Sequence, residues 1–292
     1  MVTKRYSMNE NRKFLILGSN GQLGKQFKLE LAERKIPFDA PDEKASDLTD
    51  FAGIEKVIVA SSPTIIVNCA AYNAVEEAER KPDLAYLVNG KAVENLATIC
   101  SRHGIFLVHY STDYVFDGRK GSPYVEEDKT NPLNFYGKSK LSGERGVQDN
   151  LDRYLLFRTS WVYGDGPQNF IHKLLGWATS NRELKLTDDE VSVPTNTKDL
   201  ASFTLLALDK GLTGLYHLTN GGSASRYEWG KYVLQQLGRN VAVVPVPMNT
   251  FPSTVQRPLC TAMSNRSLEQ ALGVTIPDWK TSCAQFLETR KI

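Results

Sequence analysis

A glycine-rich turn near the start of the chain constrains the fold more than any other feature. The β-rich run 13–17 stops at Gly18, further glycines follow at Gly21 and Gly24, and a helical pattern then continues to about residue 34. Strand, glycine turn and helix is the context of a dinucleotide-binding fingerprint. In that fingerprint the first glycine permits the tight turn, the second lets the backbone approach a pyrophosphate, and the third lets the helix pack on the strand. The free N–H groups at the helix start would then face the phosphates.

The glycines follow the spacing G-x-x-G-x-x-G, which is typical of the short-chain dehydrogenase variant of this fingerprint. A glycine-rich turn that binds no ligand is the alternative, and the position of the turn after the first strand disfavours it. We therefore predict that the turn binds a cofactor through Gly18, Gly21, Gln22, Leu23 and Gly24.

Long apolar runs indicate the fold class. Residues 64–69 and 105–110 are apolar almost throughout, as expected for strands of a parallel sheet that is covered on both faces. A further strand is predicted at 155–160, and weaker strand patterns lie at 216–218 and 241–244. Helices are predicted at 82–102, 226–237 and 277–289. The pattern predicts an α/β fold with a doubly wound parallel sheet, Rossmann-like, and a smaller C-terminal substrate-binding portion.

The domain organisation follows from where these patterns change. Patterns become shorter and turns denser after about residue 160. We predict a dinucleotide-binding domain over 13–160 and a mostly substrate-binding portion over 161–292, partly interleaved with the first domain. Residues 1–12 are polar and lack the apolar core of a secretory signal, so we expect a loose leader there.

Tyr136 and Lys140 are the strongest catalytic candidates. They are four residues apart, so on a helix their side chains share one face. An ammonium beside a phenol favours the phenolate and is expected to lower the pKa of Tyr136, which could then protonate a ketone oxygen as hydride reaches the carbon. Thr112, at the end of a preceding strand, would place its hydroxyl beside the same oxygen. The alternative is an ordinary exposed helix pair.

Further cofactor contacts are expected after the second and third strands. Asp47, followed by Leu48, could accept a hydrogen bond from an adenine amino group or cap the next helix. The small residues Ala70 and Ala71, followed by Tyr72, would let a cofactor lie against the backbone. Asn89, in the predicted helix 82–102, is either a buried polar organiser or a surface residue.

The choice between NADH and NADPH is less clear from the sequence. The weak second strand 36–38 is followed by Asp39, which could hold a ribose 2′-OH, and by Lys44, which could offset repulsion of a 2′-phosphate. We predict relaxed specificity between the two cofactors.

Composition excludes several function classes. A net charge of +2 with 23% charged residues gives no general nucleic-acid or membrane signal, and no apolar run reaches the ~18 residues of a spanning helix. The four cysteines have no C-x-x-C spacing and are interpreted as reduced core thiols in a cytoplasm. The four histidines form no metal-ligand pattern, so no metal is predicted.

Four sequence blocks, at 67–72, 109–116, 132–140 and 157–163, occur in an order that resembles dTDP-4-dehydrorhamnose reductases, an extended branch of the short-chain dehydrogenase/reductase superfamily. The resemblance covers residue 13 to about 290. It implies reduction of the C4 ketone of a dTDP-6-deoxy-hexulose by NADPH or NADH to give dTDP-L-rhamnose. It also implies that Thr112, Tyr136 and Lys140 form the catalytic trio.

The resemblance further implies substrate contacts. Asp113, Tyr114 and Trp161 would flank the sugar, and Asn169 and Arg257 would lie near the nucleotide diphosphate. Packing aromatics and a surface charge are the alternatives for Trp161, Tyr114 and Arg257.

This sequence departs from the family pattern at some positions, which limits the family properties that can be expected of it. Cys69 stands where the family usually has Ala, and Tyr72 where it often has His. Some members pair through magnesium held by carboxylates near the C-terminus. The tail here has one glutamate, so neither metal nor dimer is carried over, and a homodimer stays open.

Rival functions differ in identifiable residues. A nucleotide-sugar dehydratase needs a glutamate after the Thr-Asp pair, whereas Tyr114 follows Asp113 here. A nucleotide-sugar epimerase shares the tyrosine, the lysine and a bound nicotinamide. A regulatory subunit related to the one of methionine adenosyltransferase uses the same fold without catalysis, and the retained trio argues against it.

Overall fold

A six-stranded parallel sheet forms the centre of the protein, as shown by a computed structural model that describes residues 12–289. The strand order is β10-β5-β4-β3-β1-β2, so the order reverses between β1 and β3. The reversal marks the point where open α/β sheets bind ligands, at the carboxyl ends of the strands. The strands are β1 (Phe14–Leu17), β2 (Phe38–Asp39), β3 (Ile65–Asn68), β4 (Phe106–Thr112), β5 (Tyr154–Thr159) and β10 (Gly214–His217).

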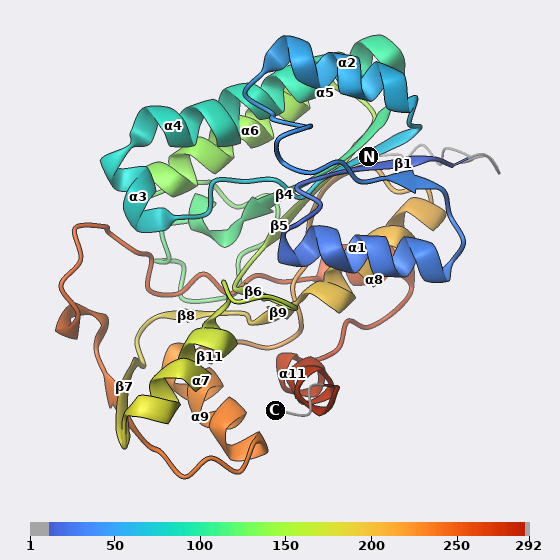
Figure 1. Ribbon diagram of the computed structural model, residues 1–292. Helices are drawn as coiled ribbons and strands as arrows, with labels where there is room; N and C mark the ends of the chain where they lie inside the picture. Colours follow the sequence, from blue (N-terminus) through green and yellow to red (C-terminus); the bar gives the residue numbers. More distant parts are fainter. Residues whose placement is uncertain (1–11, 290–292) are drawn as a thin grey trace.

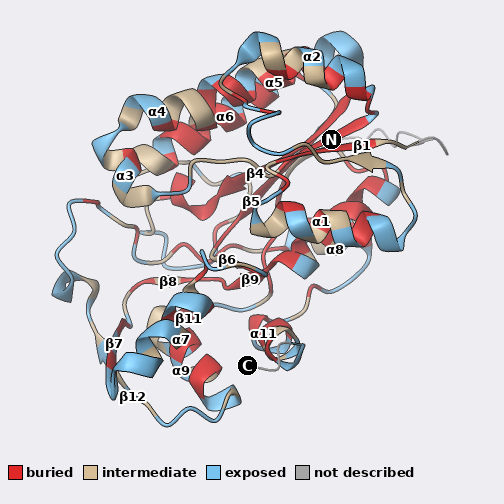
Figure 2. Cartoon of the chain, viewed as in Figure 1, coloured by how far each residue is buried: buried red, intermediate tan, exposed pale blue. Residues whose placement is uncertain are grey.

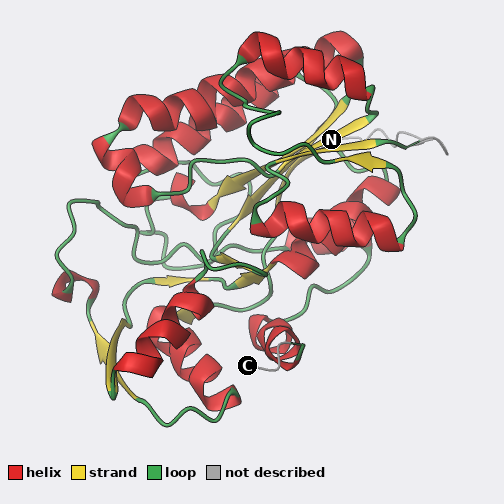
Figure 3. Ribbon diagram, viewed as in Figure 1, coloured by secondary structure: helices red, strands yellow, loops and turns green. Residues whose placement is uncertain are grey.

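Helices cover both faces of this sheet (Figures 1 and 3). One face carries α2 (Phe51–Ser61), α4 (Pro82–Tyr86), α5 (Ala92–His103) and α6 (Phe135–Asn150), and the other α1 (Gln22–Glu33), α8 (Thr197–Asp209) and α10 (Arg266–Leu272). The sequence of β1 is continuously apolar because both faces of the strand are buried. Phe14 and Ile16 pack in the core on one face of the sheet, and Leu15 and Leu17 pack in the core on the other face. Figure 2 shows the resulting buried sheet. The predicted doubly wound α/β fold is confirmed.

A second, smaller body packs at the carboxyl edge of the sheet (Figure 1). It contains α7 (Phe170–Ser180), α9 (Arg226–Gln236) and α11 (Trp279–Glu288) around a separate core. Its short strands pair two by two: β7 (Glu183–Thr187) with β12 (Ala242–Val246), β8 (Val191–Ser192) with β11 (Ala224–Ser225), and β6 (Val162–Tyr163) with β9 (Thr195–Asn196). The described residues also form the short helix α3 (Val75–Arg80) and the 3₁₀ turns η2 (Asp113–Val115) and η3 (Met248–Thr250).

Residues beyond 160 contribute to both bodies, because α8, β10 and α10 return to the central sheet. The exact boundary at 160 stays a prediction. The predicted leader falls on residues of which only Arg12 is described. No helix within residues 12–289 is long and apolar enough to cross a membrane.

The prediction of one continuous helix over 82–102 is wrong. α4 ends at Tyr86, a π-helical turn, η1, runs over Leu87–Lys91, and α5 then begins at Ala92. Asn89 belongs to this turn, and its side chain bonds to the backbone of Tyr72, outside the helix. Apolar periodicity continues through the turn, so the pattern alone could not reveal it. The sequence patterns also did not predict the helices α7, α8 and α10.

Candidate active site

The catalytic candidates meet at the carboxyl edge of the sheet. Thr112 is the last residue of β4, and its register partner is Thr159 at the end of β5. Tyr136 lies in the first turn of α6, which begins there because the Asn134 side chain caps the helix by accepting from Gly137 N–H at 2.9 Å. The Thr112 hydroxyl lies near enough to Tyr136 to affect the pKa of the phenol, so the structure brings the predicted threonine and tyrosine together.

Lys140 lies one turn further along α6 and is almost fully buried. Its Nζ donates to the carbonyl oxygen of Tyr110 at 2.6 Å. Burial lowers the pKa of Lys140 to about 8, and the negative charge of Glu144 partly offsets that shift. Glu144 is itself held by Arg158 in a buried ion pair, with Nη2 to Oε2 at 2.7 Å.

The predicted effect of Lys140 on Tyr136 is not observed. Burial raises the pKa of Tyr136 to about 12, the charge of Asp113 adds to the rise, and the neighbouring Thr112 hydroxyl partly offsets it. Lys140 does not contribute, because its ammonium is directed at the Tyr110 carbonyl. The Tyr136 hydroxyl also donates to Asn73 Oδ1 at 3.4 Å, a contact that the sequence analysis missed.

Tyr114 and Arg257 belong to a chain of polar contacts that crosses between the two bodies. Arg257 donates to the Tyr114 hydroxyl at 3.1 Å and to Glu76 at 2.6 Å. The Tyr114 hydroxyl donates to Glu190 at 3.3 Å, and burial raises the pKa of Tyr114. Arg226 lies 3.7 Å from Glu190. Glu76, Glu190 and Arg226 were missed, because nothing in the sequence links them to Tyr114.

Trp161 is held in an unusual conformation at the same edge. Its φ is +41°, in the left-handed region that a bulky residue rarely adopts. The guanidinium of Arg226 lies 3.5 Å from the centre of its indole ring, and the indole N–H is buried without a hydrogen-bond partner. One ring face is therefore occupied by Arg226, and a sugar contact of Trp161 stays a prediction.

The glycine turn has the predicted geometry. Gly18 has a φ of +70°, and a Cβ there would come within 2.6 Å of the Ala70 backbone. A Cβ on Gly24 would come within 2.4 Å of the Gly18 carbonyl oxygen. Both glycines are therefore required by the fold itself. The backbone N–H groups of Gln22, Leu23 and Gly24 donate to no backbone carbonyl within the described chain, as expected at a helix start that faces phosphates.

The loop after β3 is held from two sides. Asn68 Oδ1 accepts from Ala70 N–H at 3.0 Å, while Ala71 lies beyond it in the same loop. Asn89 accepts from Tyr72 N–H at 2.8 Å and donates to the Tyr72 carbonyl oxygen at 3.0 Å. Asn89 is fully buried, so the organiser role is confirmed and the surface alternative is wrong.

Asp47 and Leu48 precede α2. Leu48 is buried, and the Asp47 carboxylate accepts from the N–H and hydroxyl of Thr49. Asp50, not Asp47, caps α2, so the capping alternative for Asp47 is wrong because the helix begins later than expected. An adenine contact stays a prediction.

Asn169 links the two bodies. Its amide donates to Gln22 Oε1 at 3.0 Å and to the carbonyl oxygens of Gly164 and Gly166, while its Oδ1 caps α7 at His172. The Gln22 side chain also accepts from Gly164 N–H. Asn169 therefore lies beside the glycine turn, and its predicted diphosphate contact stays a prediction.

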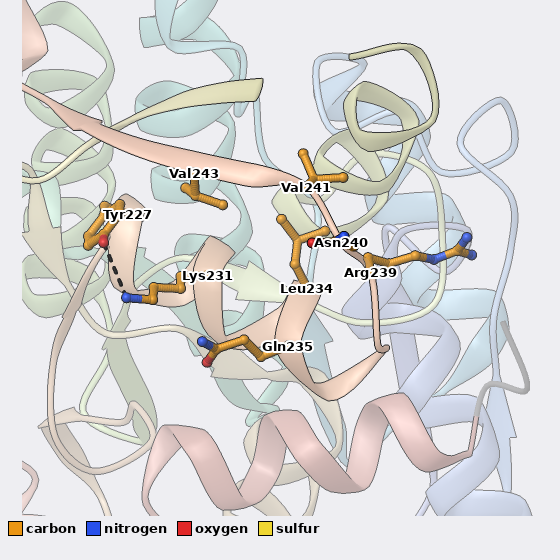
Figure 4. Close-up of a pocket in the computed structure, with 8 residues that line it drawn as sticks. All are labelled: Tyr227, Lys231, Leu234, Gln235, Arg239, Asn240, Val241 and Val243. Atoms are coloured by element: carbon orange, nitrogen blue, oxygen red, sulfur yellow. Dashed lines mark hydrogen bonds between the residues drawn. The ribbon is translucent and has the colours of Figure 1, made fainter. Parts of the chain in front are cut away.

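A pocket of about 260 Å³ lies away from these residues, between α9 and β12 (Figure 4). Its lining includes Tyr227, Lys231 and Arg239 but no residue of the predicted site. Figure 4 shows Lys231 directed at the Tyr227 hydroxyl, at 3.3 Å. The catalytic candidates and not this pocket therefore define the site. Within residues 12–289, no group of His, Cys, Asp and Glu is arranged to hold a metal ion.

The sheet, the glycine turn and the Tyr136–Lys140 helix define the class as a nicotinamide-dependent oxidoreductase of the short-chain dehydrogenase type. A family model described as the RmlD substrate binding domain matches residues 12–292, and the chain belongs to that family. A dTDP-4-dehydrorhamnose reductase from Burkholderia thailandensis is 36% identical, with 92% of this chain and 95% of that protein covered.

Two solved structures are similar over the whole fold. A dTDP-4-dehydrorhamnose reductase from Clostridium acetobutylicum has a TM-score of 0.93 at 35% identity, covering 96% of this chain and 100% of that one. The enzyme from Bacillus anthracis, solved in complex with NADP, also has a TM-score of 0.93, at 32% identity and the same coverage. The family suggested by the four sequence blocks is thus confirmed.

The first prediction concerns the clamp formed by Asn89. Asn89→Ala removes the bonds to Tyr72 and the bond to Ser139 at 3.0 Å, and leaves buried backbone groups unsatisfied. We expect a loss of about 2–4 kcal/mol in the free energy of unfolding, measured by urea denaturation. Asn95→Ala is the control, because the Asn95 amide nitrogen is buried without a partner. Equal losses in the two variants would contradict the clamp.

Proposed function

We propose that this protein reduces the C4 ketone of dTDP-4-dehydro-L-rhamnose to dTDP-L-rhamnose with NADPH or NADH. The observation that carries the proposal is the placement of Thr112 at the end of β4 beside Tyr136, with Lys140 one turn further along the same helix as Tyr136. Membership of a family whose named relatives are dTDP-4-dehydrorhamnose reductases supports the substrate.

The residues present fit a nicotinamide dinucleotide. The N–H groups of Gln22, Leu23 and Gly24 at the start of α1, which donate to no backbone carbonyl of residues 12–289, match a pyrophosphate, and Ala70 and Ala71 offer a loop without bulky side chains. When bound, the cofactor supplies the hydride for the ketone carbon. The Lys140 ammonium, now on the Tyr110 carbonyl, is the group that would hold the nicotinamide ribose.

Residues of the protein position and protonate the ketone oxygen. Tyr136 donates the proton that the alkoxide requires, and Thr112 positions the carbonyl beside it. Because the phenol has a raised pKa here, it stays protonated at neutral pH and is ready to act as an acid. Arg257, Tyr114, Asp113 and Trp161 are the proposed contacts for the rest of the nucleotide sugar.

Location and assembly complete the proposal. All four cysteines are free thiols, which suits a reducing cytoplasm. A homodimer stays a prediction.

The second prediction tests the proton donor. Tyr136→Phe keeps the ring but removes the hydroxyl, so turnover should fall roughly two to four decades. Turnover is measured as NADPH oxidation at 340 nm with the 4-keto sugar nucleotide at saturation. Tyr110→Phe is the control, because its hydroxyl bonds to Thr204 in the core instead. Near-full turnover of Tyr136→Phe would rule out the assignment.

The third prediction concerns the cofactor. The Asp39 carboxylate is already bound by Lys13 at 2.8 Å and by Ser61 at 2.6 Å, and the Lys13 hydrogen bond holds the pKa of Asp39 below its usual range. The two partners of Asp39 lie on its Oδ2 and compete with a ribose 2′-OH for the carboxylate, while Lys44 is exposed. We expect kcat/KM for NADH and NADPH to lie within about thirtyfold, or about 2 kcal/mol. A preference for one cofactor above about a thousandfold in kcat/KM would contradict this prediction and show that one side chain determines cofactor specificity at the ribose.

A further inference from the structure

A loop of the smaller body is fastened to the central-sheet body on both sides of Arg257. This loop, residues 251–259, is the strap; it follows η3 and runs to the starts of α3 and α6 (Figure 1). The Ser253 hydroxyl donates to Glu76 on α3 at 3.2 Å. Further along, the strap packs on Gly118, where a Cβ would come within 2.8 Å of the Leu259 backbone nitrogen. The strap therefore connects the two bodies at defined points.

Asn134 holds the strap directly beside Arg257. Its Nδ2 donates to the backbone carbonyl oxygen of Gln256 at 2.9 Å, and the Asn134 residue is only 1% exposed. The Gln256 side chain is exposed, whereas Val255 before it is buried. Because a buried amide donor is costly to leave unpaired, this bond fixes the backbone at the residue that precedes Arg257.

The same asparagine fixes the start of the catalytic helix. Its Oδ1 accepts from Gly137 N–H at 2.9 Å and so caps α6, two residues before Tyr136. The oxygen faces an N–H and the nitrogen faces a carbonyl, so a flipped amide would lose both bonds. Because both bonds belong to one planar amide, the position of Tyr136 is tied to that of Gln256.

Arg257 is held from two sides and still has donors to offer. Its guanidinium donates to the Tyr114 hydroxyl at 3.1 Å and to Glu76 at 2.6 Å. A guanidinium has five N–H donors. These bonds within the described chain use two of them, so donors remain for an anion. The Arg257 side chain is 24% exposed, which gives an anion access, and the planar arrangement of its N–H groups suits a phosphate.

We propose that Asn134 is a positioning residue that sets the spacing between Tyr136 and Arg257. Through its Oδ1 it places the proton donor at the ketone end of the substrate. Through the strap it places Arg257 at the diphosphate end, so a sugar nucleotide held at one end is aligned at the other. The inference rests on the proposed reductase function and adds the residue that couples the two ends of its site.

The two bonds of Asn134 can be separated by substitution. Serine caps helices well, so Asn134→Ser keeps the cap, but its shorter side chain cannot reach the Gln256 carbonyl. Asn134→Asp has the shape of asparagine and also caps, yet its carboxylate has no hydrogen for Gln256. Both variants should bind dTDP, in the presence of NADP, about tenfold more weakly, the size of one lost hydrogen bond. Isothermal titration calorimetry measures the affinity, and urea unfolding shows that the variants are folded.

Two comparisons show whether Asn134 acts through Arg257. In an Arg257→Gln background, Asn134→Ser should weaken dTDP binding less than about twofold further, because the group that it positions is gone. Asn131→Ser changes an exposed asparagine just before α6 and should leave the dTDP affinity of the wild type. A full tenfold loss in the Arg257→Gln background, or wild-type affinity in both Asn134 variants, would overturn the proposal.

The binding measurement also separates this inference from the proposed function. A wild type that binds dTDP, with the expected losses in the variants, but oxidises no NADPH with the 4-keto sugar nucleotide would overturn the reductase function. It would still leave Asn134 as the residue that places Arg257. A wild type that binds no dTDP would overturn the inference.

Discussion

The close packing of α6 against the π-helical turn is the constraint on which the site depends. A Cβ on Gly143 would come within 2.2 Å of the Asn89 carbonyl oxygen, and one on Gly146 within 2.8 Å of the Glu94 side chain. The two helices can approach this closely only because these positions have no side chain. Asn89 then bonds to Ser139 on α6 and to Tyr72 after β3. One buried amide thereby fixes the catalytic helix relative to the proposed cofactor loop.

Burial gives this site its chemical character. Lys140, Asp113 and Tyr136 all have pKa values displaced toward the neutral form, and desolvation is the largest cause for each. Glu144, which Arg158 holds in a buried ion pair, partly offsets the shift of Lys140. A neutral phenol is the form that a ketone reductase needs as its acid, so the dry environment suits reduction.

Sequence patterns predicted the parts of this structure that rest on local signals. The glycine turn and the strands β1, β3, β4 and β5 follow from apolar runs and glycine spacing, which depend on neighbouring residues alone. The π turn was missed because apolar periodicity runs through it, and the bond of Asn89 in that turn to Tyr72 joins residues 17 positions apart. The partners of Asp113 lie 79 and 148 residues away, at Ser192 and Thr261, and only the fold brings them together. The direction of the Lys140 ammonium likewise depends on the Tyr110 carbonyl, which helix spacing cannot reveal.

The most direct test of the account follows the hydrogen that reaches C4 of the sugar. The protein is given dTDP-4-dehydro-L-rhamnose and NADPH carrying deuterium at the transferable position of the nicotinamide, and the product is analysed by NMR. We expect one deuterium at C4 of dTDP-L-rhamnose for each cofactor molecule oxidised. Turnover without net oxidation of the cofactor, as an epimerase would give, or deuterium at any other carbon, would contradict it.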